Sequence, residues 1–148
     1  MQQMAINIIP LQKDSYQDII QVWEASVRAT HSFLSEADIQ FYKPLILNQY
    51  LDQLSLFGIL DHANKLAGFI GIEGVKIQML FVHPDNFQQG VGRALCMYSV
   101  EELGICQVDV NEDNPGACLF YSKLGFKIAG RSPLDESGKP FPILHLAI

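Results

Sequence analysis

The chain has 148 residues, of which 49% are apolar and 18% are charged, and its ten Lys and Arg against sixteen Asp and Glu give a formal net charge of −6. Since domains commonly have about 100–200 residues, this length predicts a single domain with a hydrophobic core of its own. The negative charge argues against a strongly basic nucleic-acid-binding protein, because the field of the molecule would repel phosphate. The apolar content argues against a disordered chain.

The cysteines and the N-terminus bear on where the protein works. Cys96, Cys106 and Cys118 form neither a disulfide framework nor a zinc-binding spacing, which favours a reducing compartment. The first ten residues lack the cationic patch and apolar stretch of a secretory signal. The longest apolar run, Leu66–Ile72, falls far short of the roughly 20 residues that cross a bilayer. We therefore expect a soluble cytoplasmic protein without membrane contacts.

Hydrophobic periodicity and turn residues predict a strand, two helices and three more strands in the first half of the chain. Their expected ranges are Ala5–Ile9, 14–28, 35–43, Ser55–Leu60, Leu66–Glu73 and Lys76–Val82. Ser35 followed by Asp38 indicates a helix start. We expect that helix to be interrupted at Lys43-Pro44, because proline disfavours helical conformation in the residue before it.

The second half of the chain alternates helices and strands. The expected ranges are Gly90–Leu103 (helix), Cys106–Val110 (strand), Pro115–Leu124 (helix), and the strands Phe126–Arg131 and Pro142–Ile148. Gly104 and Gly125 are placed to end the two helices. No repeat or linker divides the chain, so we expect one domain over residues 1–148. Three consecutive strands followed by alternating helices and strands predict an α/β (α+β) fold, a mixed sheet with helices packed against it.

The segment Met79–Leu95 contains a loop with two glycines, Gly90 and Gly92, at the start of a helix. Free N–H groups at a helix N-terminus form an anion site, and glycine lets phosphate oxygens approach the backbone. A P-loop requires Gly-Lys-Ser/Thr, but Arg93 and Ala94 follow Gly92. A dinucleotide-binding loop has a third glycine and begins directly after its strand, whereas here seven residues follow the strand before Gly90.

The loop resembles motif A, Gln/Arg-x-x-Gly-x-Gly/Ala, of the GNAT acyltransferase superfamily, with Phe87 at the usual Gln or Arg. Residues 111–126, Asn-Glu-Asp-Asn-Pro-Gly-Ala-Cys-Leu-Phe-Tyr-Ser-Lys-Leu-Gly-Phe, resemble motif B, Asn-x-x-Ala-x-x-Phe-Tyr-x-x-x-Gly-Phe, at every fixed position. The two motifs lie in the family's order with a strand between them. Residues 29–34 and 130–140 resemble the bacterial YjaB-type subgroup in particular.

The resemblance implies the GNAT fold, with a mixed sheet of about seven strands and about four flanking helices. It implies acetyl-CoA as cosubstrate, no metal, and direct attack of a primary amine of a small molecule or peptide on the thioester in a ternary complex. Tyr121 is implied as the general acid beside the thioester sulfur, because a phenol of pKa about 10 can protonate a thiolate whose parent pKa is about 8.5. The residues implied to bind the cofactor are Leu80, Phe81, Val82, Gln88, Gln89, Gly90, Val91, Gly92, Arg93, Asn111, Asn114, Ala117, Phe120, Tyr121 and Lys123, with Gln78 on the same strand.

The general base stays open at this point. Asp109, His31, Glu73 and His83 are all candidates for the base or the acceptor pocket, because carboxylates and imidazoles accept protons directly or through water. The loop holding His31 follows the first helix, where GNAT proteins usually build the acceptor site. Asp109 alternates with two valines, so we expect it on the other face of its strand, where it can line the cleft.

The distribution of charge refines the expected partners. Residues 1–75 have four basic and eight acidic side chains, which suits a cationic amine acceptor, whereas Lys123, Lys127 and Arg131 form a basic stretch that we expect beside the cofactor. Two alternatives remain: an acyl-CoA binding or sensing module without efficient catalysis, and a protein or tRNA acetyltransferase. RNA is disfavoured by the charge. The sequence does not distinguish a monomer from a homodimer.

Overall fold

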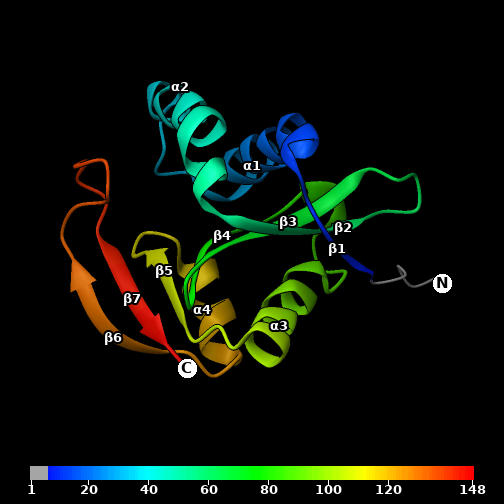
Figure 1. Cartoon of the computed structure of the whole chain (residues 1–148). Coiled ribbons are helices and arrows are strands. Elements are labelled where there is room, and N and C mark those ends of the chain that lie inside the picture. The colour runs from blue at the N-terminus through cyan, green and yellow to red at the C-terminus, as the bar shows by residue number, and fades with distance from the viewer. Residues whose placement is uncertain (1–6) are drawn as a thin grey trace.

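The computed structural model describes residues 7–148 and arranges their seven strands in one mixed sheet (Figure 1). The strands are β1 (Ile8–Pro10), β2 (Ser55–Leu60), β3 (Leu66–Glu73), β4 (Lys76–Val82), β5 (Gln107–Asn111), β6 (Lys127–Ser132) and β7 (Ile143–Ala147). Their order in the sheet is β1-β2-β3-β4-β5-β7-β6. Neighbouring strands are antiparallel except β4 and β5, which are parallel.

Two pairs of helices cover the sheet, one pair on each face (Figure 1). One face is covered by α1 (Tyr16–Thr30) and α2 (Glu36–Leu45), and the other by α3 (Val91–Leu103) and α4 (Pro115–Lys123). Two hydrophobic clusters follow from this arrangement. Ile19, Trp23 and Phe69 belong to the first, and Leu95 and Ile77 belong to the second. Because both faces of β3 are covered, all its residues except Glu73 are buried, which explains its uninterrupted apolar sequence.

The three central strands have the bounds that the sequence predicts, whereas the expected interruption of α2 at Lys43-Pro44 is wrong. The capping box of Ser35 and Asp38 starts α2 as expected, but the helix continues through Pro44 to Leu45 and is followed by a π-helical turn, Ile46–Tyr50. Proline removes only one N–H, whose partner would be the carbonyl of Gln40. Since Gln40 is exposed, water can satisfy that carbonyl, so the helix is not broken.

The remaining boundaries differ from the prediction by small shifts. A 3₁₀ turn, Lys13–Ser15, precedes α1, and β5 begins one residue later than expected. The strand expected at Ala5–Ile9 is observed as Ile8–Pro10, and its first two predicted residues lie outside the described range. Such shifts are typical of element ends, where local hydrogen bonds compete. The expected fold class is confirmed.

The functionally decisive feature of the sheet is the divergence of β4 from β5. Only two residue pairs join these strands, Lys76 with Gln107 and Ile77 with Val108. On its other edge, β4 pairs with β3 on both sides of Gln78, which is skipped in the register and forms a bulge. Figure 1 shows β4 and β5 separating beyond this point. The facing edges of both strands therefore carry backbone groups without a strand partner.

Candidate active site

A cavity of ≈ 1190 Å³ lies between the diverging strands. Its walls come from α1, α2, β4, the glycine loop, β5, the start of α4 and the connection between β6 and β7. Segments distant in sequence meet here because the sheet order places β4 beside β5. A cavity of this size exceeds the usual range of about 300–1,000 Å³ for small-ligand pockets, so it has room for a long ligand.

Most residues that the sequence singles out line this cavity. They are His31, Glu73, Gln78, Leu80, Phe81, Val82, Gln88, Gly90, Val91, Gly92, Arg93, Asp109, Asn111, Asn114, Ala117, Phe120 and Tyr121. Gln89, His83 and Lys123 do not line it. The side chain of Gln89 accepts a hydrogen bond from Asn86, and His83 Nδ1 accepts one from the backbone N–H of Asp85, capping the turn at 84–86. His83 therefore does not face the cavity.

The glycine loop presents backbone donors to the cavity. Gly90 precedes α3 in the left-handed conformation, with φ = 81°, and Gln88 also has positive φ, at 62°. The N–H groups of Val91, Gly92 and Arg93 start the helix, so they have no intrahelical acceptor, and no described residue accepts a hydrogen bond from them. These donors and the positive end of the helix dipole fit a phosphate group. The loop can therefore hold the pyrophosphate of a coenzyme A molecule.

Replacing Gly92 with Ala is expected to separate stability from ligand binding. A Cβ at Gly92 would lie 3.5 Å from Val82 Cγ2 and 3.6 Å from Phe120 Cζ, which are ordinary contacts. The variant should gain about 0.5–1 kcal/mol in the free energy of unfolding, since Ala loses less entropy than Gly in a helix. The methyl group would lie against Val82 and Phe120, and motif A accepts Ala at this position, so the Kd for acetyl-CoA should change little. Urea unfolding and calorimetry check the two effects, and a loss of acetyl-CoA binding would contradict this placement of the methyl group.

His31 and Asn114 join α1 to α4 across the cavity wall. Asn114 Oδ1 accepts from the backbone N–H of Ala117, which caps α4 and leaves the Asn114 amide N–H to donate to His31 Nε2, at 3.2 Å. His31 Nδ1 then carries the proton and donates to Thr30 Oγ1, at 2.8 Å, and Thr30 Oγ1 donates to the carbonyl of Ser26. This chain of bonds fixes both the rotamer and the tautomer of His31.

Burial lowers the pKa of His31 from 6.5 to about 4. His31 is therefore neutral near pH 7. Between about pH 6.5 and 4 the unfolded chain binds a proton at this residue that the folded chain does not bind, so the free energy of unfolding falls as the pH decreases through this window. His31→Gln should reduce that decrease, measured by urea unfolding at pH 7, 5.5 and 4.5, with the exposed His62→Gln as matched control. An unchanged pH dependence in His31→Gln would contradict the assignment.

Tyr121 lies on α4 with its ring in the core and borders the cavity. The ring makes edge contacts with Phe120 and Phe126, at centroid distances of 5.0 and 5.5 Å. Burial, with a smaller contribution from Cys96, raises the pKa of Tyr121 far above its usual value of 10. No described residue accepts a hydrogen bond from its hydroxyl. The phenol therefore remains protonated and available as a donor to a ligand.

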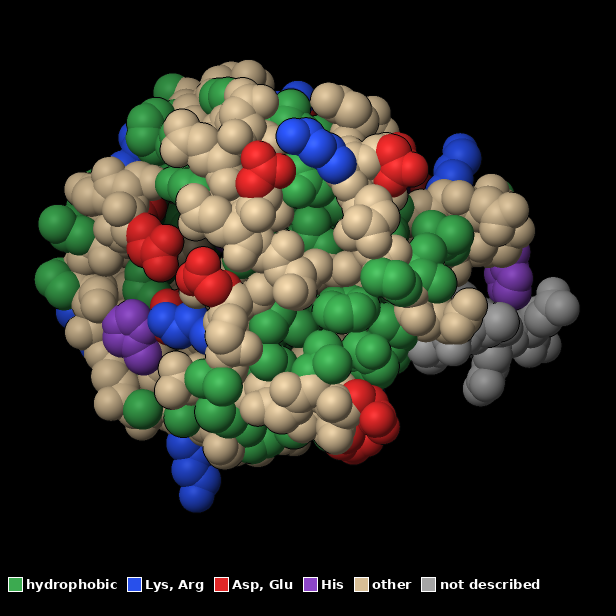
Figure 2. All heavy atoms as spheres, in the orientation of Figure 1, with side chains coloured by type: hydrophobic (Ala, Val, Ile, Leu, Met, Phe, Trp, Pro, Cys, Tyr) green, Lys and Arg blue, Asp and Glu red, His purple; other side chains and the backbone are tan. Residues whose placement is uncertain are grey.

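The charge of the cavity wall is strongly negative. Five acidic side chains line it, from Glu73, Asp109, Asp113, Asp135 and Glu136, and Arg93 is the single Lys or Arg of the described residues that does so. Figure 2 shows acidic side chains gathered around the hollow below α2. The basic stretch expected beside the cofactor is not part of the cavity wall, because Lys123, Lys127 and Arg131 do not line the cavity and Arg131 is paired with Glu112, at 2.6 Å.

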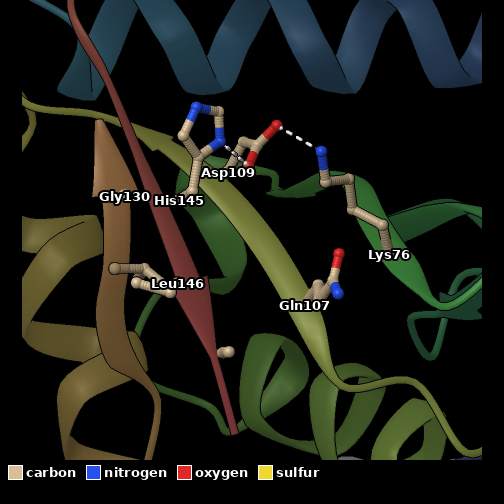
Figure 3. Close-up of a pocket in the computed structure, with 8 residues that line it drawn as sticks. Lys76, Gln107, Asp109, Gly130, His145 and Leu146 are labelled. Carbon is tan, nitrogen blue, oxygen red and sulfur yellow. Dashed lines mark hydrogen bonds and ion pairs between the residues drawn. The ribbon is translucent and has the colours of Figure 1, made fainter. Parts of the chain in front are cut away.

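Sequence reasoning did not single out His145 or the contacts of the β6–β7 connection. His145 lies opposite Asp109 in the pairing of β5 with β7, and its Nδ1 lies 2.6 Å from Asp109 Oδ1 (Figure 3). The sequence signal that could have identified His145 is that it is a single histidine within the otherwise apolar strand Ile143–Ala147. In the connection, Asp135 accepts a hydrogen bond from Tyr42, and Lys139 contacts Asp38, at 3.3 Å. These two contacts hold the connection against α2 at the edge of the cavity.

Comparisons with known proteins agree with this geometry. Residues 53–128 match the family model of the acetyltransferase (GNAT) domain. The chain is 35% identical over 143 residues to the peptidyl-lysine N-acetyltransferase YjaB of Salmonella typhimurium, covering 97% of this chain and 98% of that protein. The solution structure of apo-form YjaB from Escherichia coli superposes with a TM-score of 0.87 at 33% identity, covering 97% of each chain.

A further solved structure has the same fold at lower identity. The PaiA N-acetyltransferase of Thermoplasma acidophilum, in complex with coenzyme A, has a TM-score of 0.75 and 21% identity over 98% of this chain and all of that one. None of the helices in residues 7–148 has the length and apolar character needed to cross a membrane.

Proposed function

The chain belongs to the GNAT family of acetyl-CoA-dependent N-acetyltransferases, and from this premise we propose that its acceptor is the ε-amino group of a lysine in a peptide or protein. The observation that carries the proposal is the acidic wall of the cavity, with five carboxylates and one arginine. Such a wall attracts a cationic side chain and disfavours an anionic acceptor. The YjaB proteins of Salmonella typhimurium and Escherichia coli are named peptidyl-lysine N-acetyltransferases, in agreement with this acceptor class.

The donor supplies an acetyl group activated as a thioester. The amide edge of β4 beyond Gln78 has no partner strand, so its N–H and C=O groups can bind the extended pantetheine chain as a neighbouring strand would. The N–H groups of Val91, Gly92 and Arg93 hold the pyrophosphate. These two sets of backbone donors place the thioester at the gap between β4 and β5, beside Tyr121.

The reaction requires one proton to leave the acceptor and one to reach the departing sulfur. A neutral amine nitrogen forms the new bond to the acetyl carbon as the carbon–sulfur bond breaks. The Tyr121 hydroxyl donates its proton to the thiolate, and the proton lost by the amine restores the phenol through solvent. Because the pKa of Tyr121 is raised, the phenol keeps its proton at neutral pH and gives it up only as negative charge develops on the departing sulfur beside it.

The test is an acetyl-transfer assay on N-terminally blocked peptides that contain a single lysine. We expect coenzyme A release and a mass increase of one acetyl group on the peptide, with little transfer to the same peptide carrying norleucine at that position. Polyamines and aminoglycosides serve as alternative acceptors. Faster transfer to one of these than to any lysine peptide would overturn the acceptor class, and acetyl-CoA binding without transfer to any amine would favour a binding or sensing module.

A further inference from the structure

We propose that Asp109 binds the ammonium group of the incoming lysine, and that Lys76 occupies the same carboxylate as an internal counter-ion until the acceptor displaces it. This inference rests on the proposed function, because it requires a cationic acceptor. It assigns an acceptor-binding residue, an internal competitor and two residues that orient the carboxylate. Each of the four lies on a different strand: Lys76 on β4, Asp109 on β5, Ser132 on β6 and His145 on β7.

Asp109 stands where two cavities meet. It lines the large cavity that also contains Tyr121, and it lines a second cavity of ≈ 390 Å³ on the open face of the β5–β7–β6 part of the sheet. Its Oδ1 lies 2.6 Å from His145 Nδ1, and its Oδ2 lies 2.8 Å from Lys76 Nζ (Figure 3). A carboxylate accepts about four hydrogen bonds. Two donors therefore leave it with capacity for a ligand in the large cavity.

His145 and Ser132 orient this carboxylate. With Asp109 ionised, His145 Nδ1 carries the proton that bonds to it, so Nε2 is the acceptor for the Ser132 hydroxyl, at 2.7 Å. The same order of groups occurs in serine hydrolases, but Ser132 lines neither cavity and so cannot reach a thioester there. The chain of bonds acts on Asp109, because it limits the rotamers of the carboxylate and holds Oδ1 toward His145.

Lys76 is the displaceable partner. The side chain of Lys76 is 28% exposed and that of Asp109 is 18% exposed, so the pair is open to water on one side and a second cation can reach the carboxylate. An acceptor lysine offers the same primary ammonium with additional contacts to the cavity wall, so it can compete successfully. The smaller cavity, which Lys76 and Gln107 line, gives the displaced ammonium space beside polar groups. Lys76 also belongs to one of the two residue pairs that join β4 to β5, so it lies at the point of divergence.

Asp109 is suited to bind and orient the acceptor rather than to take its proton. Both of its oxygens already accept hydrogen bonds, Oδ1 from the His145 N–H and Oδ2 from the Lys76 ammonium, which fixes the position of the carboxylate. An anion fixed in this way aligns the acceptor nitrogen, and the ammonium group then loses its proton to solvent to give the neutral amine. Removal of the carboxylate should therefore weaken acceptor binding more than it slows turnover of the bound complex.

The test is binding of a blocked single-lysine peptide to the protein with coenzyme A bound, measured by calorimetry, together with steady-state kinetics at saturating acetyl-CoA. Asp109→Asn should raise the peptide Kd and KM by about tenfold, the loss expected for one charge-assisted hydrogen bond, and leave the KM for acetyl-CoA nearly unchanged. Lys76→Met should lower the peptide Kd by about two- to fivefold, since it removes the competitor. In the Asp109→Asn background Lys76→Met should have no effect.

Two further variants separate a specific role from a general one. Lys65→Met, in the exposed turn between β2 and β3, makes the same change of charge away from the site and should leave the peptide Kd unchanged. His145→Leu removes the donor to Asp109 and should raise the peptide KM with a smaller effect on kcat. His145→Asn retains an N–H close to the position of Nδ1 and should restore most of the loss.

The outcomes distinguish this inference from the proposed function. A peptide Kd that is unchanged or raised in Lys76→Met, or unchanged in Asp109→Asn, overturns the inference even if the wild type acetylates lysine. Asp109-dependent peptide binding without acetyl transfer overturns the proposed function and supports the inference. A wild type that binds no lysine peptide contradicts both.

Discussion

Replacing Tyr121 with Phe is expected to lower kcat by about 10²–10⁴-fold, the usual contribution of a positioned general acid. Phe keeps the ring that packs against Phe120 and Phe126 and removes only the hydroxyl, so the core of the protein should be preserved. The Kd for acetyl-CoA should change much less than kcat, because the hydroxyl is needed when the thiolate forms and not when the thioester binds. Initial-rate kinetics and calorimetry give the two quantities.

Tyr98→Phe is the matched control for this experiment. Tyr98 lies on α3, and its half-buried ring contacts Phe57 at a centroid distance of 5.6 Å, away from the residues that line the cavity. Loss of the Tyr98 hydroxyl should leave kcat close to the wild-type value. Full activity in Tyr121→Phe, or an equal loss in both variants, would exclude Tyr121 as the general acid.

Replacing Leu95 with Ala is expected to lower the free energy of unfolding by about 2–5 kcal/mol, through the lost burial and the cavity that remains. Leu95 has no exposed surface and belongs to the cluster that joins α3 to the sheet. Because α3 carries the glycine loop at its N-terminus, the variant should also bind acetyl-CoA less tightly at temperatures near its midpoint of unfolding. Urea unfolding with and without acetyl-CoA measures both effects.

Leu119→Ala provides the comparison within another helix. Leu119 is 56% exposed on α4, so the same substitution removes little buried surface and should change the free energy of unfolding by less than about 0.5 kcal/mol. Equal destabilisation by the two substitutions would contradict core packing as the source of the effect, because Ala has a higher helix propensity than Leu and does not destabilise a helix through propensity.

The sequence predicted the central strands correctly because their signals are local. Ser55–Leu60, Leu66–Glu73 and Lys76–Val82 are short apolar segments bounded by turn residues, and their bounds in the structure are the same. Motif B likewise placed Tyr121 on a helix that Asn114 caps, as observed. The interruption predicted in α2 failed because the cost of Pro44 depends on whether the freed carbonyl of Gln40 meets water, which is decided by tertiary exposure.

The charged groups of the site illustrate the limit of sequence reasoning. Lys123, Lys127 and Arg131 are close in sequence to motif B, yet the side chains that border the cavity are mostly acidic and come from separate segments. A count of charges along the chain does not say which way each side chain points. The acidic character of the first 75 residues pointed to a cationic acceptor. However, four of the five acidic residues that line the cavity come from the second half of the chain, namely Asp109, Asp113, Asp135 and Glu136.

By itself, the sequence determined the family, the mixed sheet with its flanking helices, the backbone donors of the glycine loop and the phenol of Tyr121. Each is encoded within a short segment, where periodicity, glycine and capping residues act on their neighbours. Only the tertiary structure decided that Asn114 meets His31, 83 residues earlier, and that His145 meets Asp109, 36 residues earlier. Such contacts depend on the order of strands in the sheet and on the divergence of β4 from β5, which arise from packing of the whole chain and leave no local pattern.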